Sequence, residues 1–204
     1  IDIPEIADKW KKGPAVPIEL VVPAEVNTGE KINIQAVITN NKVGHEFPTG
    51  PLDIIQAWVQ IEVTDQDGKV VFSSGTQDHG HFIEPGAFMF KAEPVDQYGN
   101  LIDKHNLWEM VGVRYRRSMF PGFSDKAEYA FSCPATMQKG EGEKKTVPQT
   151  DFEFAPQVSG ELHVNAKLMY RKFDQFLLNF LFGAEAGLTS PITVMSEDNK
   201  TIVV

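Results

Sequence analysis

Apolar and polar residues alternate along several short segments of this chain. The clearest segments are 32–38 and 55–63, where every second residue is apolar. That period of two is typical of a β-strand with one face on a core. We expect strands at 18–22, 32–39, 54–64, 70–73, 107–116, 127–131 and 161–170, separated by turns rich in Gly, Asn and Asp. Many short strands at this spacing predict a mainly β protein with an immunoglobulin-like antiparallel β-sandwich.

Two segments have helical rather than strand periodicity. Residues 4–12 predict two helical turns that end at Gly13 and Pro14. In residues 172–182 the apolar side chains recur three and four positions apart, on one helical face: Phe173, Phe176, Leu177, Phe180 and Leu181. We expect a short helix packed on the edge of the sandwich. A docking helix for a partner is the alternative, because Leu178 and Phe182 widen the apolar surface.

The length of 204 residues fits a lead-in segment at 1–14 and one β-sandwich domain at 15–204, with the helix as an insertion. Residues 138–145, rich in Gly, Glu and Lys, predict a solvated loop. The net charge of −9 argues against nucleic acid and anionic membrane surfaces as partners. No apolar run is long enough to span a bilayer. The first residues are not a signal peptide, so we expect any leader to have been removed or to lie upstream.

The segment between the two clearest strands presents a histidine in a constrained loop. It reads Asn-Asn-Lys-Val-Gly-His-Glu-Phe-Pro-Thr-Gly over residues 40–50, with His45 near its centre. Pro48 fixes its own φ and restricts Phe47, so the loop should have one defined shape. A histidine held in this way can hydrogen-bond, titrate or bind a metal.

This motif, Asn-x-x-Gly-His-x-Phe-Pro-Thr-Gly followed by a strand with Trp58, resembles the β-sandwich domain found C-terminal to the haem-binding part of many bacterial multihaem c-type cytochromes. Residues 67–75, 96–102 with His105 and Trp108, 120–125 and 168–173 are similar to later segments of the same family. Together they cover most of residues 15–195. The resemblance implies an electron-transfer context and a periplasmic or extracellular location.

The chain departs from that family in its cysteine content. Haem c is attached through Cys-x-x-Cys-His, whereas Cys133 is the only cysteine here. The resemblance therefore implies that haem c is carried by another segment or chain. This chain would be either the haem-free domain of a longer cytochrome or a haem-free subunit that docks on one. We interpret Cys133, which precedes Pro134 at the end of an apolar strand, as a buried structural thiol.

Each histidine has a functional and a structural interpretation. The resemblance implies that His45 supplies the sixth ligand of a haem iron held elsewhere; the alternative is that His45 pins its loop by hydrogen bonds. His105 would face the same haem edge. His79 and His81 would share one face of an extended backbone and could bind a metal, although a polar surface loop is favoured. We place His163 on the solvent face of a strand.

Arg114, Arg116 and Arg117 form the only basic cluster near aromatic residues. Guanidinium groups suit carboxylates, including haem propionates, so Arg114 and Arg116 are candidate cofactor contacts. The alternative is pairing with some of the 28 acidic residues of the chain.

Motifs of nucleophilic hydrolases, phosphate-binding loops and zinc proteases are absent from the sequence, so we expect no enzymatic activity in this chain. Two functional classes compete. The first is the haem-free β-sandwich part of a multihaem electron-transfer assembly, with a distal histidine and a docking surface. The second is an immunoglobulin-like binding or assembly module with structural histidines, and a small metal-binding domain using His79 and His81 is a third option.

Overall fold

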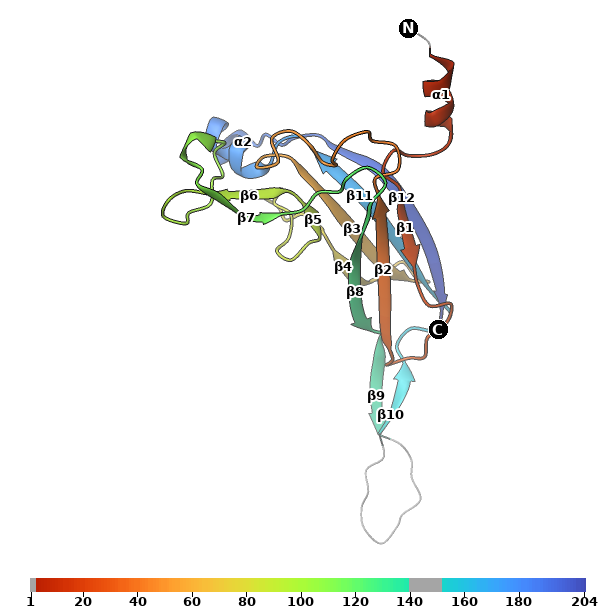
Figure 1. Cartoon of the computed structure of the whole chain (residues 1–204). Coiled ribbons are helices and arrows are strands. Elements are labelled where there is room, and N and C mark those ends of the chain that lie inside the picture. The colour runs from red at the N-terminus through yellow and green to blue at the C-terminus, as the bar shows by residue number, and fades with distance from the viewer. Residues whose placement is uncertain (1–2, 140–151) are drawn as a thin grey trace.

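Two antiparallel β-sheets pack face to face in this protein (Figure 1). The computed structural model describes residues 3–139 and 152–204. One sheet has the strand order β1 (Ile18–Val21), β2 (Lys31–Thr39) and β8 (Ser124–Ser132). The other has the order β12 (Ile192–Val203), β11 (Glu161–Arg171), β3 (Gln56–Asp65) and β4 (Val70–Ser74), with β5 (Met89–Phe90) also beside β3. The predicted mainly β sandwich is confirmed.

The core lies between the two sheets and follows the predicted alternation. On β2 every second residue from Ile32 to Ile38 is fully buried, and β11 behaves in the same way from Leu162 to Leu168. Beside β11 in the same sheet, β3 contributes its own inward-facing residues: Ala57, Val59, Ile61 and Val63. Burying each large aliphatic side chain stabilises the fold by roughly 1.5–3 kcal/mol, so this layer holds the sheets together.

A second buried cluster lies on the outer face of the five-stranded sheet. Trp58 and Arg171 are both almost completely buried there, although they point away from the main core. The chain leaving β4 crosses directly over this face at Gly75, whose carbonyl accepts a 2.9 Å hydrogen bond from Trp58 Nε1. Gly75 has φ +76°, and a Cβ there would overlap the carbonyl oxygen of Val59. Only glycine allows this close crossing.

Smaller elements gather at one end of the sandwich (Figure 1). They are the β6 (Ala92–Val95) and β7 (Gly112–Arg116) hairpin, the 3₁₀ turns η1 (Leu107–Glu109) and η2 (Ala184–Ala186), and α2 (Gln175–Phe182). At the opposite end, β9 (Ala135–Lys139) and β10 (Phe152–Pro156) pair and extend beyond the sheets. The N-terminal helix α1 (Pro4–Lys11) stands apart from the sandwich. None of the helices in the described residues is long and apolar enough to cross a membrane.

Several element predictions need correction. The strand expected at 107–116 forms only over Gly112–Arg116, because its first residues make the 3₁₀ turn η1. Strands β5, β6, β9, β10 and β12 were not predicted. The loop expected at 138–145 begins in a strand, since Gln138 and Lys139 belong to β9; residues 140–145 lie outside the described part.

Both predicted helices are present. The helix expected at 172–182 begins at Gln175, because the Asp174 carboxylate caps it by accepting a 2.8 Å hydrogen bond from the Leu177 N–H. The helix expected at 4–12 ends at Lys11, two residues before Gly13, which has φ +98°.

Candidate functional site

The loop between β2 and β3 presents His45 on a fixed backbone. The side-chain amide of Asn40, fully buried at the end of β2, donates to the carbonyls of His45 (2.9 Å) and Met119 (3.0 Å). Two residues further on, Phe47 exchanges backbone hydrogen bonds of 2.8 and 2.7 Å with Met119. The Phe47–Pro48 peptide is cis, and both residues are buried. His45 itself is exposed, so a buried frame holds an accessible imidazole.

The His45 ring has a defined orientation. Its Nδ1 lies 2.9 Å from the carbonyl oxygen of Glu46. Because a carbonyl only accepts hydrogen bonds, Nδ1 carries the proton in this contact. In the neutral ring the lone pair is then on Nε2, the nitrogen that binds metals in many histidine sites.

The residue after His45 ties the loop to the β6–β7 hairpin. The Glu46 carboxylate pairs with Arg116 Nη2 at 2.6 Å and also accepts a short hydrogen bond from the Ser118 hydroxyl. The position of the imidazole therefore depends on β7 as well as on β2.

His105 is attached to a later part of the same β2–β3 connection. Its Nδ1 lies 2.6 Å from Oδ2 of Asp53, whose side chain is only 4% exposed. Asp53 belongs to the segment that leads into β3, where Ile54 accepts a hydrogen bond from the Asp174 N–H at the start of α2. The structure thus attaches His45 and His105, 60 positions apart in sequence, to one loop at one end of the sandwich.

The three arginines of the predicted basic cluster all have carboxylate partners. Arg114 pairs with Glu93 at 2.8 Å, Arg116 with Glu46, and Arg117 with Asp125 at 3.4 Å. Intramolecular pairing, the alternative interpretation, is observed for each of them. Burial raises the pKa of Glu93, but hydrogen bonds from Lys91 and Arg114 outweigh it and leave the pKa below its usual value. More than half of the Arg114 and Arg116 side chains remains exposed.

His79 and His81 do not lie on an extended backbone, so the premise of the predicted metal pair is wrong. They occupy a tight turn in which Asp78 and Phe82 are hydrogen-bonded and His81 has φ +64°. Glu84, an acidic residue three positions after His81, accepts hydrogen bonds from the Gly75 N–H and the Thr76 hydroxyl. Among the described residues no group of three His, Cys, Asp or Glu side chains is arranged to hold a metal ion.

Two other sequence expectations are confirmed. Cys133 is almost completely buried, and burial raises the pKa of its thiol, as expected for a structural cysteine. His163 is exposed on β11.

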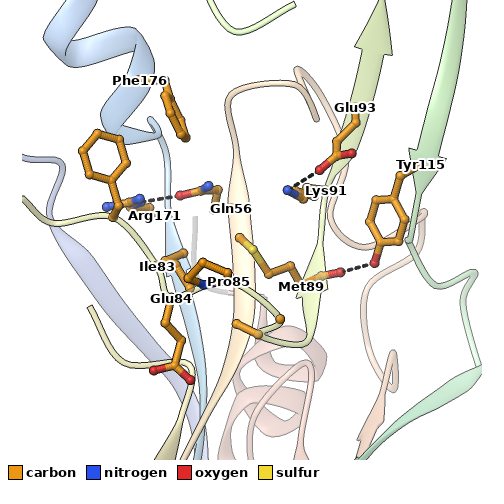
Figure 2. A pocket seen from close by; sticks show the side chains of 13 residues that line it. Gln56, Ile83, Glu84, Pro85, Met89, Lys91, Glu93, Tyr115, Arg171 and Phe176 are labelled. Atoms are coloured by element: carbon orange, nitrogen blue, oxygen red, sulfur yellow. Dashed lines mark hydrogen bonds and ion pairs between the residues drawn. The ribbon is translucent and has the colours of Figure 1, made fainter. Parts of the chain in front are cut away.

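An open pocket of about 360 Å³ lies over the second buried cluster (Figure 2). Arg171 lies at one side of it and donates from Nε to Gln56 Oε1 at 2.6 Å, and from Nη1 to the His81 carbonyl at 2.7 Å. On the other side Lys91 pairs with Glu93 at 2.5 Å. Arg171, Lys91 and Glu93 therefore each have a hydrogen-bond or ion-pair partner within the protein.

Sequence reasoning did not single out Arg171. The available signal was its place in the alternating strand β11, where it lies opposite Gln56 on the outer face. An arginine in a strand is ordinarily assigned to solvent, and only the loop that covers this face makes it buried.

Asp174, which was also not identified from the sequence, is a buried carboxyl group with a raised pKa. It is 5% exposed, and burial raises its pKa to about 6, with the nearby charges of Asp53 and Asp103 adding to the rise. The Leu177 N–H and the Arg171 guanidinium act in the opposite direction.

The predicted apolar face of α2 is partly buried against the rest of the protein and partly exposed. Leu177 is buried, which confirms that the helix packs on the sandwich. The other members of the predicted face are exposed by 39–57%: Phe173, Phe176, Phe180 and Leu181. With Phe182 and Leu188, also at least half exposed, they form an uncovered apolar surface beside the histidine loop.

Comparison with solved structures finds the same architecture in part of a larger protein. The chain is similar to a penta-haem cytochrome c552 from Thermochromatium tepidum, with a TM-score of 0.59 and 18% sequence identity. The match covers 92% of this chain and 40% of that chain. No protein-family model matches the sequence, and no curated protein matches it. At this identity the likeness is one of fold: the chain resembles part of a multihaem cytochrome c.

Proposed function

We propose that this chain is the haem-free β-sandwich part of a multihaem cytochrome c electron-transfer assembly, and that His45 is the distal ligand of a haem carried by another segment or chain. The observation that carries the proposal is the His45 ring itself. Its Nδ1 donates to the Glu46 carbonyl, so in the neutral ring of this exposed imidazole the lone pair is on Nε2. An oriented and accessible imidazole of this tautomer would be able to bind haem iron.

The chain's own residues would prepare this ligand and limit its motion. Asn40 and the Phe47–Met119 pair fix the backbone on both sides of His45, so ligation would lose little conformational entropy. Gly44 has no neighbouring atom within 4 Å of a Cβ position, which leaves that side open to a flat macrocycle. The bound haem would supply one-electron redox chemistry, and this chain would contribute no catalytic residue.

His105 is the second candidate ligand. The Asp53 carboxylate orients its Nδ1, an arrangement that also occurs behind metal-bound histidines. Arg114 and Arg116 remain candidate contacts for haem propionates because their side chains are more than half exposed. To bind a propionate, Arg114 would give up its pairing with Glu93, and Arg116 its pairing with Glu46.

The rest of the assembly would dock on the apolar surface of α2. The assembly would lie in the periplasm or outside the cell, and cell fractionation tests this location. A tagged chain purified from its native source should bring with it a protein that shows the absorption bands of haem c.

The decisive experiment is a spectroscopic and potentiometric titration of the assembled complex. His45→Ala should convert one haem to a form that binds carbon monoxide, and His45→Met should raise the reduction potential of that haem, because a thioether ligand favours the ferrous state relative to imidazole. His163→Ala, at an exposed histidine on β11 that has no role in the proposal, is the matched control, and His105→Ala tests the second candidate ligand. If every haem keeps its spectrum and potential in His45→Ala, the residue only pins its loop and the ligand assignment is wrong.

A further inference from the structure

The most exposed aromatic side chains of the β6–β7 hairpin region border one groove. Tyr98 is 79% exposed and Trp108 is 83% exposed, and both line an open groove of about 460 Å³ together with Val111. Contiguous exposed apolar surface is typical of interaction sites, and Trp and Tyr are enriched among the residues that contribute most to binding at protein interfaces.

Short, internally bonded turns fix the backbone that carries the two rings. Tyr98 belongs to a turn in which the Asp96 carboxylate accepts hydrogen bonds of 2.8 Å from the N–H groups of Tyr98 and Asn100. Trp108 belongs to η1, where the Asn106 amide donates to Glu109 at 2.5 Å. Neither turn needs a partner for its shape, so the backbone of the groove is set before anything binds.

The groove is negatively charged. Its other lining residues are Asp96, Gln97 and Glu109, and none of the Lys, Arg or His residues in the described part of the chain lines it. A hydrogen bond from Asn100 lowers the pKa of Asp96, so this carboxylate is ionised at neutral pH. The faces of the Trp and Tyr rings add their own negative electrostatic potential, which attracts cations.

The same protein already places cations on aromatic rings elsewhere. The Arg117 guanidinium lies 4.0 Å from the centre of the Phe88 ring, and Lys104 Nζ lies 5.3 Å from the centre of the Phe180 ring. Within residues 3–139 and 152–204, no cation lies over the ring of Trp108, although Trp is the best aromatic acceptor of a cation.

We infer that the groove between Tyr98 and Trp108 receives a lysine or arginine side chain from a partner protein. The aliphatic stem would lie along Val111, and the charged head would lie over Trp108 and beside the carboxylates of Asp96 and Glu109. The inference rests on charge complementarity between this groove and a basic group, and it does not require the partner to carry haem.

The test is an NMR titration of the 204-residue chain with the peptide Gly-Lys-Gly-Lys-Gly, with the norleucine peptide Gly-Nle-Gly-Nle-Gly as the neutral control. The lysine peptide should shift the indole N–H of Trp108, assigned by its loss in Trp108→Phe, and the amide of Tyr98, both saturably. The norleucine peptide should not. Trp108→Ala should weaken binding about fivefold or more, and Trp108→Phe should have a smaller effect. Phe123→Ala, at an exposed aromatic residue outside the groove, is the matched control and should bind like the wild type.

Four results would overturn the inference. Equal shifts with the norleucine peptide would indicate a purely apolar contact. The same shifts with maltopentaose and none with the lysine peptide would indicate a sugar site. Binding that persists unchanged in Trp108→Ala would be general attraction to a chain of net charge −9, and the absence of any shift would show that the groove does not bind cations. His45→Ala should bind the peptide normally, so failure here and failure of the haem-ligand proposal are distinguishable.

Discussion

The carboxylate of Glu46 lies 2.6 Å from the guanidinium of Arg116, which joins the histidine loop to the β6–β7 hairpin. We expect Arg116→Gln to release this end of the loop while costing less than about 1 kcal/mol of global stability, because the arginine side chain is 56% exposed. Amide hydrogen exchange should become faster at Phe47 and Met119, whose mutual hydrogen bonds close the loop.

Arg114→Gln is the control for that change. Its partner Glu93 keeps a second cation in Lys91, and within the described residues neither Arg114 nor Glu93 makes a side-chain hydrogen bond or ion pair to the histidine loop. Exchange at Phe47 and Met119 should then be unchanged. Equal acceleration by both variants would mean that the hairpin as a whole, rather than the Glu46 pair, supports the loop.

The pKa of Asp174 makes the stability of this end depend on pH. Because the folded-state pKa of about 6 lies above the usual value of 3.8, the folded protein binds more protons than the unfolded chain between these values. Stability should therefore fall as pH rises from about 4 to 6, with the full penalty present above pH 6.

Asp174→Asn should remove that dependence and keep the cap, since an amide oxygen can still accept from the Leu177 N–H. Relative to the wild type the variant should gain stability with rising pH, by on the order of 2 kcal/mol between about pH 4 and 7. Urea unfolding across this range measures it. Asp174→Ala, which loses both the charge and the cap, separates the two effects. Parallel pH profiles for the Asp174→Asn variant and the wild type would contradict the assignment.

Truncating a buried residue of α2 should lower the free energy of unfolding much more than truncating an exposed one. Leu177→Ala should cost about 2–5 kcal/mol, because Leu177 is buried against the sandwich. Leu181→Ser should cost less than about 0.5 kcal/mol in the isolated chain, because Leu181 is 56% exposed.

In the assembled complex, the exposed residues of α2 should matter most for keeping the partner bound. Leu181→Ser combined with Phe182→Ser should release the partner while the fold survives, as measured by co-purification and by thermal unfolding of the free chain. A double variant that unfolds alone would identify this face as core, and one that retains the partner would exclude α2 from the interface.

Gly75 provides the sharpest test of the second buried cluster. Gly75→Ala should lower the free energy of unfolding by more than about 3 kcal/mol. The alanine would have to adopt a left-handed backbone conformation, and its Cβ would overlap the Val59 carbonyl oxygen of a central strand. Gly68→Ala has the same backbone strain, with φ +80°, but no neighbouring atom within 4 Å. The difference in unfolding free energy between the two variants isolates the close crossing, and equal losses would mean that only the backbone angle matters.

Most strands of the sandwich could be predicted because their apolar and polar residues alternate regularly. Ile32 to Ile38 and Leu162 to Leu168 alternate because one strand face is buried and the other is wet. Strand β12 was missed because its middle, Ser196 to Lys200, is polar like a loop. As an edge strand it is aligned by polar contacts across to β11, such as those of Asn165 with Asn199 (2.7 Å) and Glu197 (3.1 Å).

The candidate site was predictable only where it is local. The constrained loop around His45 follows from Pro48 and the residues beside it. The partners of Arg114, Arg116 and His105 lie 21, 70 and 52 positions away, so no local pattern indicates them. The buried state of Arg171 likewise depends on a loop 90 residues earlier in the chain.

Residue 204 and the histidine loop lie at opposite ends of the sandwich (Figure 1). A surface tether attached after Val204 would therefore hold the molecule with His45, the Tyr98–Trp108 groove and α2 directed outward. On a chip or electrode, that orientation presents the whole proposed contact region to a soluble cytochrome, whereas random coupling through lysines would mask part of it at Lys91 or Lys104.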